Sequence, residues 1–323
     1  MTAHGPGPGD WTKRYFGKLY GELYSRHLLP PSQTRREAEF ARHILELDGK
    51  RVLDLACGFG RHARIFSRHA WVVGLDHNHE YLARALATMP RRQVGRFSAI
   101  RGDMRRLPLR DASFDAVVLL FNSFGYFVQP PASPSLDVKR ELWKLPQVFY
   151  ERKLVSPEFG SYKTGDTPAD VAEAAQAAPI AENELVLQEI GRVLISGGQL
   201  LLEAPNPRPL IEAVMSAPRR WLITKDFEIE EEFSYDRLRR VLSNVTRFTV
   251  GNRTEVADYY LRLYSRRELV AALRRAGFEV VQIFGSYEGE PYVASSSPCM
   301  LFYGRKQGQR RRSRKRSPLI RVR

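Results

Sequence analysis

The chain has 323 residues and a hydrophobic fraction of 43%, which is enough for one large α/β domain with additions or for two modest domains. Its two cysteines, Cys57 and Cys299, are too few for a disulfide framework, and we expect buried thiols in a reducing compartment. The longest apolar runs are far shorter than the roughly 20 residues that cross a bilayer. We therefore expect a cytoplasmic protein without a membrane partner.

The net charge of +15 is concentrated at one end of the chain. Ten of the 51 Lys and Arg lie in residues 305–323, so the preceding 304 residues carry 41 basic against 36 acidic side chains. A body this mildly basic does not favour a nucleic-acid-binding protein. The segment 305–323 is predicted to be a disordered tail, as is the Gly- and Pro-rich start at 1–10. Nucleic acid is expected as a partner only through the basic tail.

The first part of the chain alternates between short apolar runs and segments of helical periodicity. This alternation predicts βαβ units on a parallel sheet. The expected strands are 51–57, 71–76, 96–103 and 114–122, and the expected helices are 62–70 and 80–89.

The alternation of strands and helices is interrupted at 128–180, where prolines and scattered charges predict an insertion between the fourth strand and its helix. A helix at 182–194, stopped by Gly197 and Gly198, then leads into a fifth strand at 199–205.

The remaining segments predict a small antiparallel sheet, followed by a return to the core. Strict alternation is typical of antiparallel strands with one buried face. A capping box and a terminal glycine mark the helix that comes next. The strands of the small sheet are expected at 227–236, 237–250 and 255–265, the helix at 265–278, and two closing strands at 279–287 and 296–306. The predicted fold is α/β, with a doubly wound, mostly parallel seven-stranded sheet and a small antiparallel accessory sheet.

The strand at 51–57 runs into a glycine loop, in the stretch "VLDLACGFGRHA" at 52–63. Gly58 to Ala63 match a dinucleotide-binding fingerprint, which alone is a weak signal. Asp54 argues against a phosphate ligand, because a carboxylate repels a pyrophosphate and attracts an ammonium or a sulfonium. The loop therefore predicts close backbone approach to a cationic ligand.

Polar side chains also end the next three strands. Asp76 follows the second strand, where an acid can accept both hydroxyls of a ribose. Asp103 and Asn122 follow the third and fourth strands. Because the carboxyl ends of parallel strands meet at one edge of the sheet, we expect these side chains to converge on one crevice.

In their order and spacing these motifs resemble the class I S-adenosylmethionine-dependent methyltransferases. The resemblance rests on the glycine loop together with "VVGLDHN", "IRGDMRRLP", "FDAVVLLFNSFGYF" and "EIGRVLISGGQLLLE". The segments at 15–30 and 32–45 resemble N-terminal helices that cover the cofactor, and the segment at 264–287 is similar to the end of small-molecule members. The resemblance implies a Rossmann-like methyltransferase fold with S-adenosyl-L-methionine as cofactor.

The resemblance also implies which residues surround the amino-acid part and the ribose of the cofactor. Asp54, Ala56, Gly58 and Gly60 would shape the pocket for the methionine part. Asp76 would bind the ribose hydroxyls. The family often has a glycine where this chain has Ala56, and we expect that change to be tolerated.

The adenine and the methyl group would meet residues of the second, third and fourth strand ends. His77 would lie beside the adenine, Asp103 would accept a hydrogen bond from its amino group, and Met104 would pack on the ring. Phe121 and Asn122 would lie under the sulfonium and the methyl. The insertion directly follows this last motif, so the shape of the acceptor stays open.

Methyl transfer from a sulfonium is an in-line displacement that depends mainly on orientation, so a catalytic residue is not obligatory. The weak candidates for contact with the acceptor are Tyr126, Glu203 and Tyr260. We expect no metal, because no His, Cys and carboxylate cluster has the spacing of a ligand set.

The predicted function is methyl transfer from S-adenosylmethionine to N or O of a small-molecule acceptor. Two alternatives stay open: a methyltransferase that holds RNA or another polyanion through its basic tail, and a non-catalytic protein that keeps the cofactor pocket. The sequence does not indicate the oligomeric state.

The predicted organisation follows the chain in order. It consists of a tail at 1–10, N-terminal helices at 11–50, a cofactor-binding core at 51–127 and 181–206, an insertion at 128–180, an accessory sheet capping the substrate at 207–263, closing elements of the core at 264–304, and a basic tail at 305–323.

Overall fold

A computed structural model describes residues 12–23, 29–128 and 180–308 of the chain. The predicted tail at 1–10, residues 309–323 of the predicted basic tail at 305–323 and nearly all of the predicted insertion lie outside the described residues. Residues 305 and 306 of the predicted basic tail form the end of a strand. No helix within the described ranges is long and apolar enough to cross a membrane.

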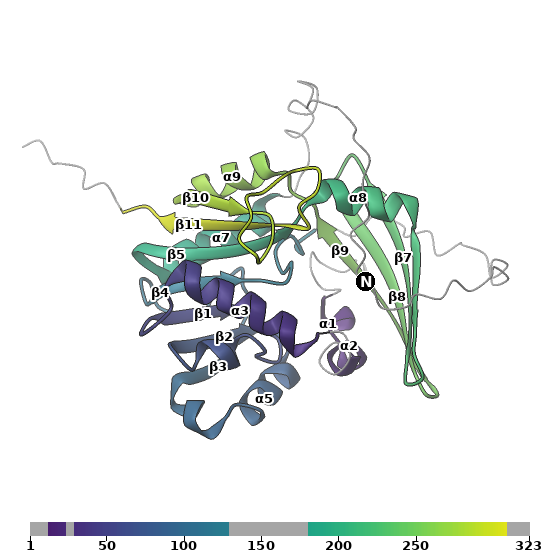
Figure 1. The fold of residues 1–323 in the computed structure, drawn as a ribbon, viewed down its shortest axis with the longest axis horizontal. Coiled ribbons are helices and arrows are strands. Elements are labelled where there is room, and N and C mark those ends of the chain that lie inside the picture. The colour runs from purple at the N-terminus through teal and green to yellow at the C-terminus, as the bar shows by residue number, and fades with distance from the viewer. Residues whose placement is uncertain (1–11, 24–28, 129–179, 309–323) are drawn as a thin grey trace, which may run out of the picture.

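A seven-stranded sheet forms the core, in the order β10-β11-β5-β4-β1-β2-β3 (Figure 1). The five strands β1 to β5 pair in parallel, and β11 runs antiparallel to both of its neighbours. This confirms the predicted doubly wound, mostly parallel sheet. The strands are β1 (Arg51–Leu55), β2 (Trp71–Asp76), β3 (Phe97–Arg101), β4 (Phe114–Leu119), β5 (Leu194–Pro205), β10 (Phe278–Phe284) and β11 (Cys299–Lys306).

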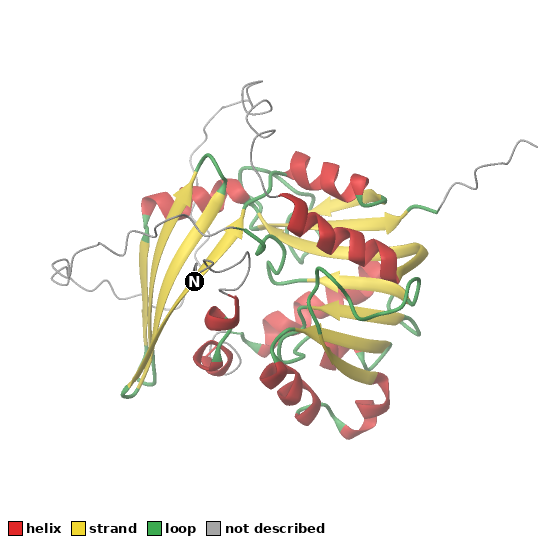
Figure 2. Cartoon of the chain, turned by 180° about the vertical axis from the view of Figure 1, so that it is seen from behind, coloured by secondary structure: helices red, strands yellow, loops and turns green. Residues whose placement is uncertain are grey.

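Helices cover both faces of this sheet (Figure 2). One face packs against α3 (Pro31–Leu45), α4 (Ala63–Phe66) and α5 (His79–Ala87), and η2 (Arg91–Arg96) precedes β3. The other face packs against α7 (Ile180–Val193) and α9 (Arg266–Arg275).

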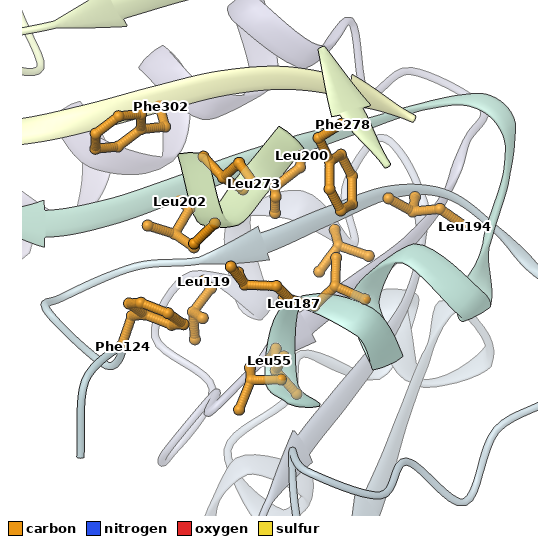
Figure 3. Close-up of a cluster of buried hydrophobic side chains, with 14 of the residues drawn as sticks. Leu55, Leu119, Phe124, Leu187, Leu194, Leu200, Leu202, Leu273, Phe278 and Phe302 are labelled. Atoms are coloured by element: carbon orange, nitrogen blue, oxygen red, sulfur yellow. The ribbon is translucent and has the colours of Figure 1, made fainter. Parts of the chain in front are cut away.

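Successive side chains of the central strands alternate between the two buried faces. In β1, Val52 packs with the α3 side and Leu53 with the α7 side. Figure 3 shows the α7 side, where Leu187 of α7 and Leu273 of α9 lie against Leu200 and the other labelled strand residues. Both faces are therefore apolar, which explains why these strands read as continuous hydrophobic runs.

A separate four-stranded antiparallel sheet, in the order β6-β7-β8-β9, stands beside the core (Figure 1). It confirms the predicted accessory sheet. Its first strand and the helix before it, α8, were not predicted. The elements are α8 (Pro207–Ser216), β6 (Arg219–Ile223), β7 (Glu228–Asp236), β8 (Val241–Val250) and β9 (Arg253–Arg262).

Two short helices, α1 (Thr12–Tyr15) and α2 (Lys18–Leu23), lie between the two sheets (Figure 1). Hydrogen bonds attach them to the start of α5, where Asn78 Nδ2 donates to the carbonyl of Phe16 at 2.8 Å. An ion pair of 3.0 Å between Arg14 and Asp258 attaches them to β9.

Several predicted boundaries needed correction. β1 and β4 end two and three residues earlier than expected, because Ala56, Phe121 and Asn122 take positive φ and turn the chain out of the sheet. Gly197 and Gly198 do not stop the preceding helix, which ends at Val193. They lie inside β5, where the register with β4 shifts.

Candidate functional site

A cavity of about 220 Å³ opens at the carboxyl ends of β1, β2 and β4, beneath α1 and α2. Its walls come from the loops after four parallel strands and from the N-terminal helices. Eight of the ten residues predicted to bind the cofactor line it: Asp54, Ala56, Gly58, Asp76, His77, Asp103, Met104 and Phe121. The other two, Gly60 and Asn122, are not among its lining residues.

The two loop glycines have different tasks. Gly58 has a φ of 53°, and a Cβ added there would meet nothing within 4 Å, so its bare backbone faces the cavity. Gly60 has a φ of 70°, and an added Cβ would lie 2.9 Å from the Cβ of Ala85 in α5. Gly60 therefore allows close packing of the loop on a helix, which is a reason for its presence that does not involve a ligand.

Asp54 is an acid buried at the end of β1, with only 2% of its surface exposed. Its Oδ2 atom has no hydrogen-bond partner among the described residues. Burial raises the pKa of Asp54 to about 7, the charge of Arg61 lowers it in part, and the charge of Asp76 adds to the rise. A buried carboxylate oxygen without a donor fits a ligand that brings an ammonium into this end of the cavity.

Asp76 is held by two backbone amides at the end of β2. Its Oδ2 accepts from the amide of Gly58 and its Oδ1 from the amide of Asn78, both at 2.9 Å. Each carboxylate oxygen has a second lone pair, so the group can still accept from two hydroxyls. The glycine loop and Asp76, the acid predicted to bind the ribose, thus hold each other in place.

Asp103, which follows β3, lines the cavity and pairs with Arg105. The guanidinium donates to Oδ2 at 2.6 Å and the Arg105 amide to Oδ1 at 2.8 Å. Burial by itself raises the pKa of Asp103, but these hydrogen bonds and the positive charge hold it below its usual value. Arg105 also contacts Glu182 at 2.5 Å and lies 4.3 Å from the ring centroid of Phe127. The sequence interpretation did not foresee this arginine in the cavity wall.

The loop after β4 is shaped by Glu203. The backbone amide of Phe121 and the hydroxyl of Tyr287 both donate to Glu203 Oε2, the latter at 2.6 Å. Glu203 is buried away from the cavity, and this burial raises its pKa. Its contacts are those of a residue that positions the loop, and they differ from the acceptor contact predicted for it.

The two tyrosine candidates lie in different places. Tyr126 lines the cavity, with its ring centroid 5.5 Å from that of Phe16 in the loop after α1. Tyr260 is 2% exposed in the apolar cluster under the accessory sheet and does not line the cavity. Phe16 and Tyr20 complete an aromatic wall on the side of the N-terminal helices.

A buried polar network behind the glycine loop was also missed by sequence reasoning. Glu37 of α3 accepts hydrogen bonds from Arg61 and, at 2.7 Å, from His62 Nε2. Arg61 and His62 both line the cavity. The partners are 24 and 25 residues apart in the sequence, and only the packing of α3 on the glycine loop brings them together.

Within the described ranges, no group of three or more His, Cys, Asp and Glu side chains could hold a metal ion. Cys57 lines the cavity as a buried thiol whose pKa is raised by burial, and neither cysteine forms a disulfide.

Most of the residues that line the cavity lie in a segment that matches a known protein family. Residues 52–140 match the family described as a methyltransferase domain. The demethylmenaquinone methyltransferase of Thermotoga maritima is 34% identical over 122 residues, which cover 35% of this chain and 51% of that protein. The match thus spans about half the length of this curated relative.

Two solved structures are similar over nearly the whole chain. The CcbJ methyltransferase from Streptomyces caelestis aligns over 91% of this chain and 98% of its own, with 17% identity and a TM-score of 0.65. The S-adenosylmethionine-bound CalS10, an amino pentose methyltransferase from Micromonospora echinaspora, aligns over 90% and 98%, with 19% identity and a TM-score of 0.52. At these identities the similarity shows a shared fold.

The strand order and the acid-lined cavity at the carboxyl edge define a Rossmann-like methyltransferase core. The family match covers residues 52–140 of this core, and the two solved structures share its fold. S-adenosylmethionine is the cofactor that such a core binds.

Proposed function

We propose that the protein transfers the methyl group of S-adenosylmethionine to N or O of a small-molecule acceptor. The observation that carries the proposal is the buried Oδ2 of Asp54, which lacks a donor inside a cavity shared with Asp76 and Asp103. A ligand that combines an ammonium, a ribose and an adenine supplies donors to all three acids. The names of the relatives, which act on demethylmenaquinone and on an amino pentose, support a small-molecule acceptor.

The cofactor supplies an electrophilic methyl group on a sulfonium. In this proposal Asp54 holds the ammonium, Asp76 holds the ribose hydroxyls, and Asp103 accepts from the adenine amino group. Phe121, on the loop that Glu203 positions, forms the wall beside the methyl.

Orientation of the acceptor against the methyl can contribute about 7–11 kcal/mol to the reduction of the barrier. Tyr126 and Phe16 form an aromatic surface of the cavity and would exclude water from the bound cofactor and acceptor. A positioned base would add about 10²–10⁴-fold only where the acceptor must lose a proton.

The first test is calorimetry with S-adenosylhomocysteine on the full chain. Asp76→Asn keeps one oxygen for the Gly58 amide and removes the charge, and Asp76→Ala removes both. We expect micromolar-range binding in the unaltered protein, a loss of about 10-fold or more in Asp76→Asn and no detectable binding in Asp76→Ala. Asp226→Ala, at an exposed acid outside the cavity, should bind as the unaltered protein does.

The second test is transfer of a labelled methyl group from the cofactor to a small-molecule extract. A labelled product of low mass is expected. Binding of S-adenosylhomocysteine without any product would favour a non-catalytic cofactor-binding protein and contradict the proposed function.

A further inference from the structure

Polar side chains lie in the middle of the inner face of the accessory sheet, the face that packs against α1 and α8. In β8, Asn244 and Thr246 are both fully buried, and Thr246 Oγ1 donates a hydrogen bond to Asn244 Oδ1. The register of β7 on β8 places Glu231 opposite Thr246, on the same face. These three side chains form what we call the inner-face cluster. Because buried polar groups are unfavourable unless they are paired, their presence among apolar neighbours needs a physical reason.

The inner-face cluster adjoins the aromatic wall of the cofactor cavity. Phe248, on the same face of β8, has its ring centroid 6.4 Å from that of Tyr20, which lines the cavity. Tyr126 also lines the cavity, and together with Tyr259 it packs against the apolar residues of the inner face. The register of β8 on β9 places Tyr259 opposite Asn244. The cluster is therefore on the cavity side of the accessory sheet, next to two tyrosines of the wall between them.

Asn244 has an amide donor that the protein leaves unused. Its Nδ2 atom is buried and has no hydrogen-bond partner among the described residues. Burial raises the pKa of the half-buried Glu231, and the charge of Arg220 lowers it in part. The amide of Asn244 also lowers this pKa, although the two groups do not form a hydrogen bond of regular geometry. A buried donor without a partner is unfavourable, so a ligand that supplies an acceptor here would be stabilised.

The inner-face cluster offers a donor and an acceptor at neighbouring positions. Asn244 Nδ2 donates, and the carboxyl group of Glu231 accepts. A ligand that carries a hydroxyl, or an amine beside a hydroxyl, satisfies both groups at once. A wholly apolar ligand would leave both without a partner, and a site built on buried polar groups discriminates strongly against such a ligand.

We propose that Asn244 and Glu231 bind the methyl acceptor, and that this acceptor is a polar small molecule with neighbouring hydroxyl or amine groups. Thr246 is the positioning residue, because its hydrogen bond to Oδ1 fixes the orientation in which Asn244 presents Nδ2. The acceptor would extend from the methyl group past Tyr126 to the inner face of the accessory sheet. This inference rests on the proposed function, since it names the class of small molecule that is methylated.

The polarity of the acceptor is tested first, on the unaltered full chain. A cell extract is partitioned between water and ethyl acetate, and each fraction is incubated with the protein and methyl-labelled S-adenosylmethionine. We expect about 10-fold or more labelled low-mass product in the aqueous fraction, because the cluster discriminates against apolar ligands. A product confined to the ethyl acetate fraction would overturn this inference and leave the proposed function standing. No product in either fraction would contradict the proposed function, and the inference with it.

The second arm tests the two side chains by kinetics on the aqueous fraction. Asn244→Leu and Glu231→Gln should each lower kcat/KM for the acceptor about 10–100-fold, chiefly through KM, because each removes a contact with the bound acceptor. Affinity for S-adenosylhomocysteine should change less than about 3-fold, since the cluster does not line the cofactor cavity. Glu230→Gln is the matched control: Glu230 is the preceding residue of β7, lies on the opposite face and pairs with Arg247. Equal losses in Glu230→Gln and Glu231→Gln would overturn the inference.

A purely structural role of the cluster predicts a different result. The double variant Asn244→Leu/Thr246→Val replaces the donor and its positioning partner with apolar groups of similar size, a change that can be neutral or stabilising. We expect an unchanged or higher melting temperature in the absence of acceptor, together with the loss in kcat/KM. A lower melting temperature with an unchanged KM for the acceptor would show that the cluster only stabilises the sheet. If the Asn244 variants do not fold, Glu231→Gln, at a half-buried position, still decides.

Discussion

Two buried carboxyl groups near Arg61 have opposite protonation behaviour. Glu37 receives hydrogen bonds from Arg61, His62 and, at 2.8 Å, Gln33, and its pKa falls to about 2 in spite of burial. Asp54 receives one backbone hydrogen bond, and its pKa rises to about 7. The number of donors around each group accounts for the difference, because burial acts on both in the same direction.

The raised pKa of Asp54 has a consequence for stability in the absence of ligand. A carboxyl group whose folded-state pKa exceeds its unfolded value of about 3.9 makes folding less favourable as the pH rises from about 4 to about 7. We therefore expect Asp54→Asn to stabilise the ligand-free protein at pH 8 by about 1–3 kcal/mol while it abolishes tight cofactor binding.

Chemical denaturation of the unaltered protein and of Asp54→Asn at pH 4.5 and pH 8 measures this effect. The stability difference should be largest at pH 8 and small at pH 4.5. Asp226→Asn serves as the surface control and should leave the pH dependence unchanged. An Asp54→Asn variant that is less stable at pH 8 would show that the carboxylate is satisfied in the ligand-free state.

At the scale of elements, the βαβ core could be predicted because length and periodicity agree there. β2 matches its predicted bounds, and the α9 capping box between Ser265 and Glu268 is present. Two elements of the accessory half gave no such signal. α8 begins with Pro207 and contains a second proline, which resembles a loop although proline suits a first helical turn. β6 is a short edge strand with half-exposed residues and no alternation.

The candidate site likewise contains residues that could be predicted from the sequence and residues that could not. Asp54, Asp76 and Asp103 could be predicted because each lies at or just beyond the end of a strand, and the strand ends of a parallel sheet share one edge. The pairing of Glu37 with Arg61 could not, because it depends on how α3 is placed on the glycine loop. Short-range patterns contain no information on such a placement.

Asn78 joins two elements at the rim of the cavity. Its Oδ1 caps α5 by accepting from the amide of Glu80 at 2.9 Å, and its Nδ2 donates to the carbonyl of Phe16 at 2.8 Å. Asn78→Asp keeps the cap and replaces the donor with an acceptor that faces a carbonyl. We expect a global stability within about 0.5 kcal/mol of the unaltered protein, with faster hydrogen exchange in residues 12–23 and several-fold weaker cofactor binding.

Asn78→Ala is the comparison for this prediction, because it removes both interactions and should also cost about 1 kcal/mol of stability. Tyr81→Phe removes a second hydrogen bond, at 2.9 Å, to the carbonyl of Gly17 and should loosen the same helices without affecting the cap. Unchanged exchange in residues 12–23 for both Asn78→Asp and Tyr81→Phe would mean that packing alone holds α1 and α2.

For the whole molecule, the question is how the accessory sheet is held over the core. The contacts include an aromatic cluster that contains Tyr15 and Tyr259, with ring centroids 4.8 Å apart, ion pairs of Arg240 and Arg262 with Glu268 of α9, and a backbone junction. In that junction the amide of Arg262 in β9 donates to the carbonyl of Gly125 at 2.9 Å. Gly125 follows Phe121 on the loop after β4, so the wall of the cofactor cavity is connected directly to the accessory sheet.

This junction depends on a glycine. Gly125 has a φ of 107°, and an added Cβ would lie 2.7 Å from the carbonyl oxygen of Arg262. Gly125→Ala therefore combines an unfavourable backbone conformation with a contact against the backbone that a side chain cannot relieve. We expect a loss of about 2–4 kcal/mol in stability, together with faster hydrogen exchange in 241–262 than in the core strands at 51–76.

Gly251→Ala is the matched control, because Gly251 also has a positive φ, of 57°, but an added Cβ there would meet nothing within 4 Å. It should lose only about 1 kcal/mol, and exchange in 51–76 should stay unchanged. The φ of Gly251 lies in the left-handed region and that of Gly125 lies outside it, so the difference between the two variants reports the contact with Arg262 together with the greater backbone strain at position 125. Equal losses in the two variants, with exchange accelerated evenly over both sheets in Gly125→Ala, would mean that the junction does not hold the accessory sheet. In that case the aromatic cluster around Tyr15 and the ion pairs of Arg240 and Arg262 with Glu268 would be the attachments to test next.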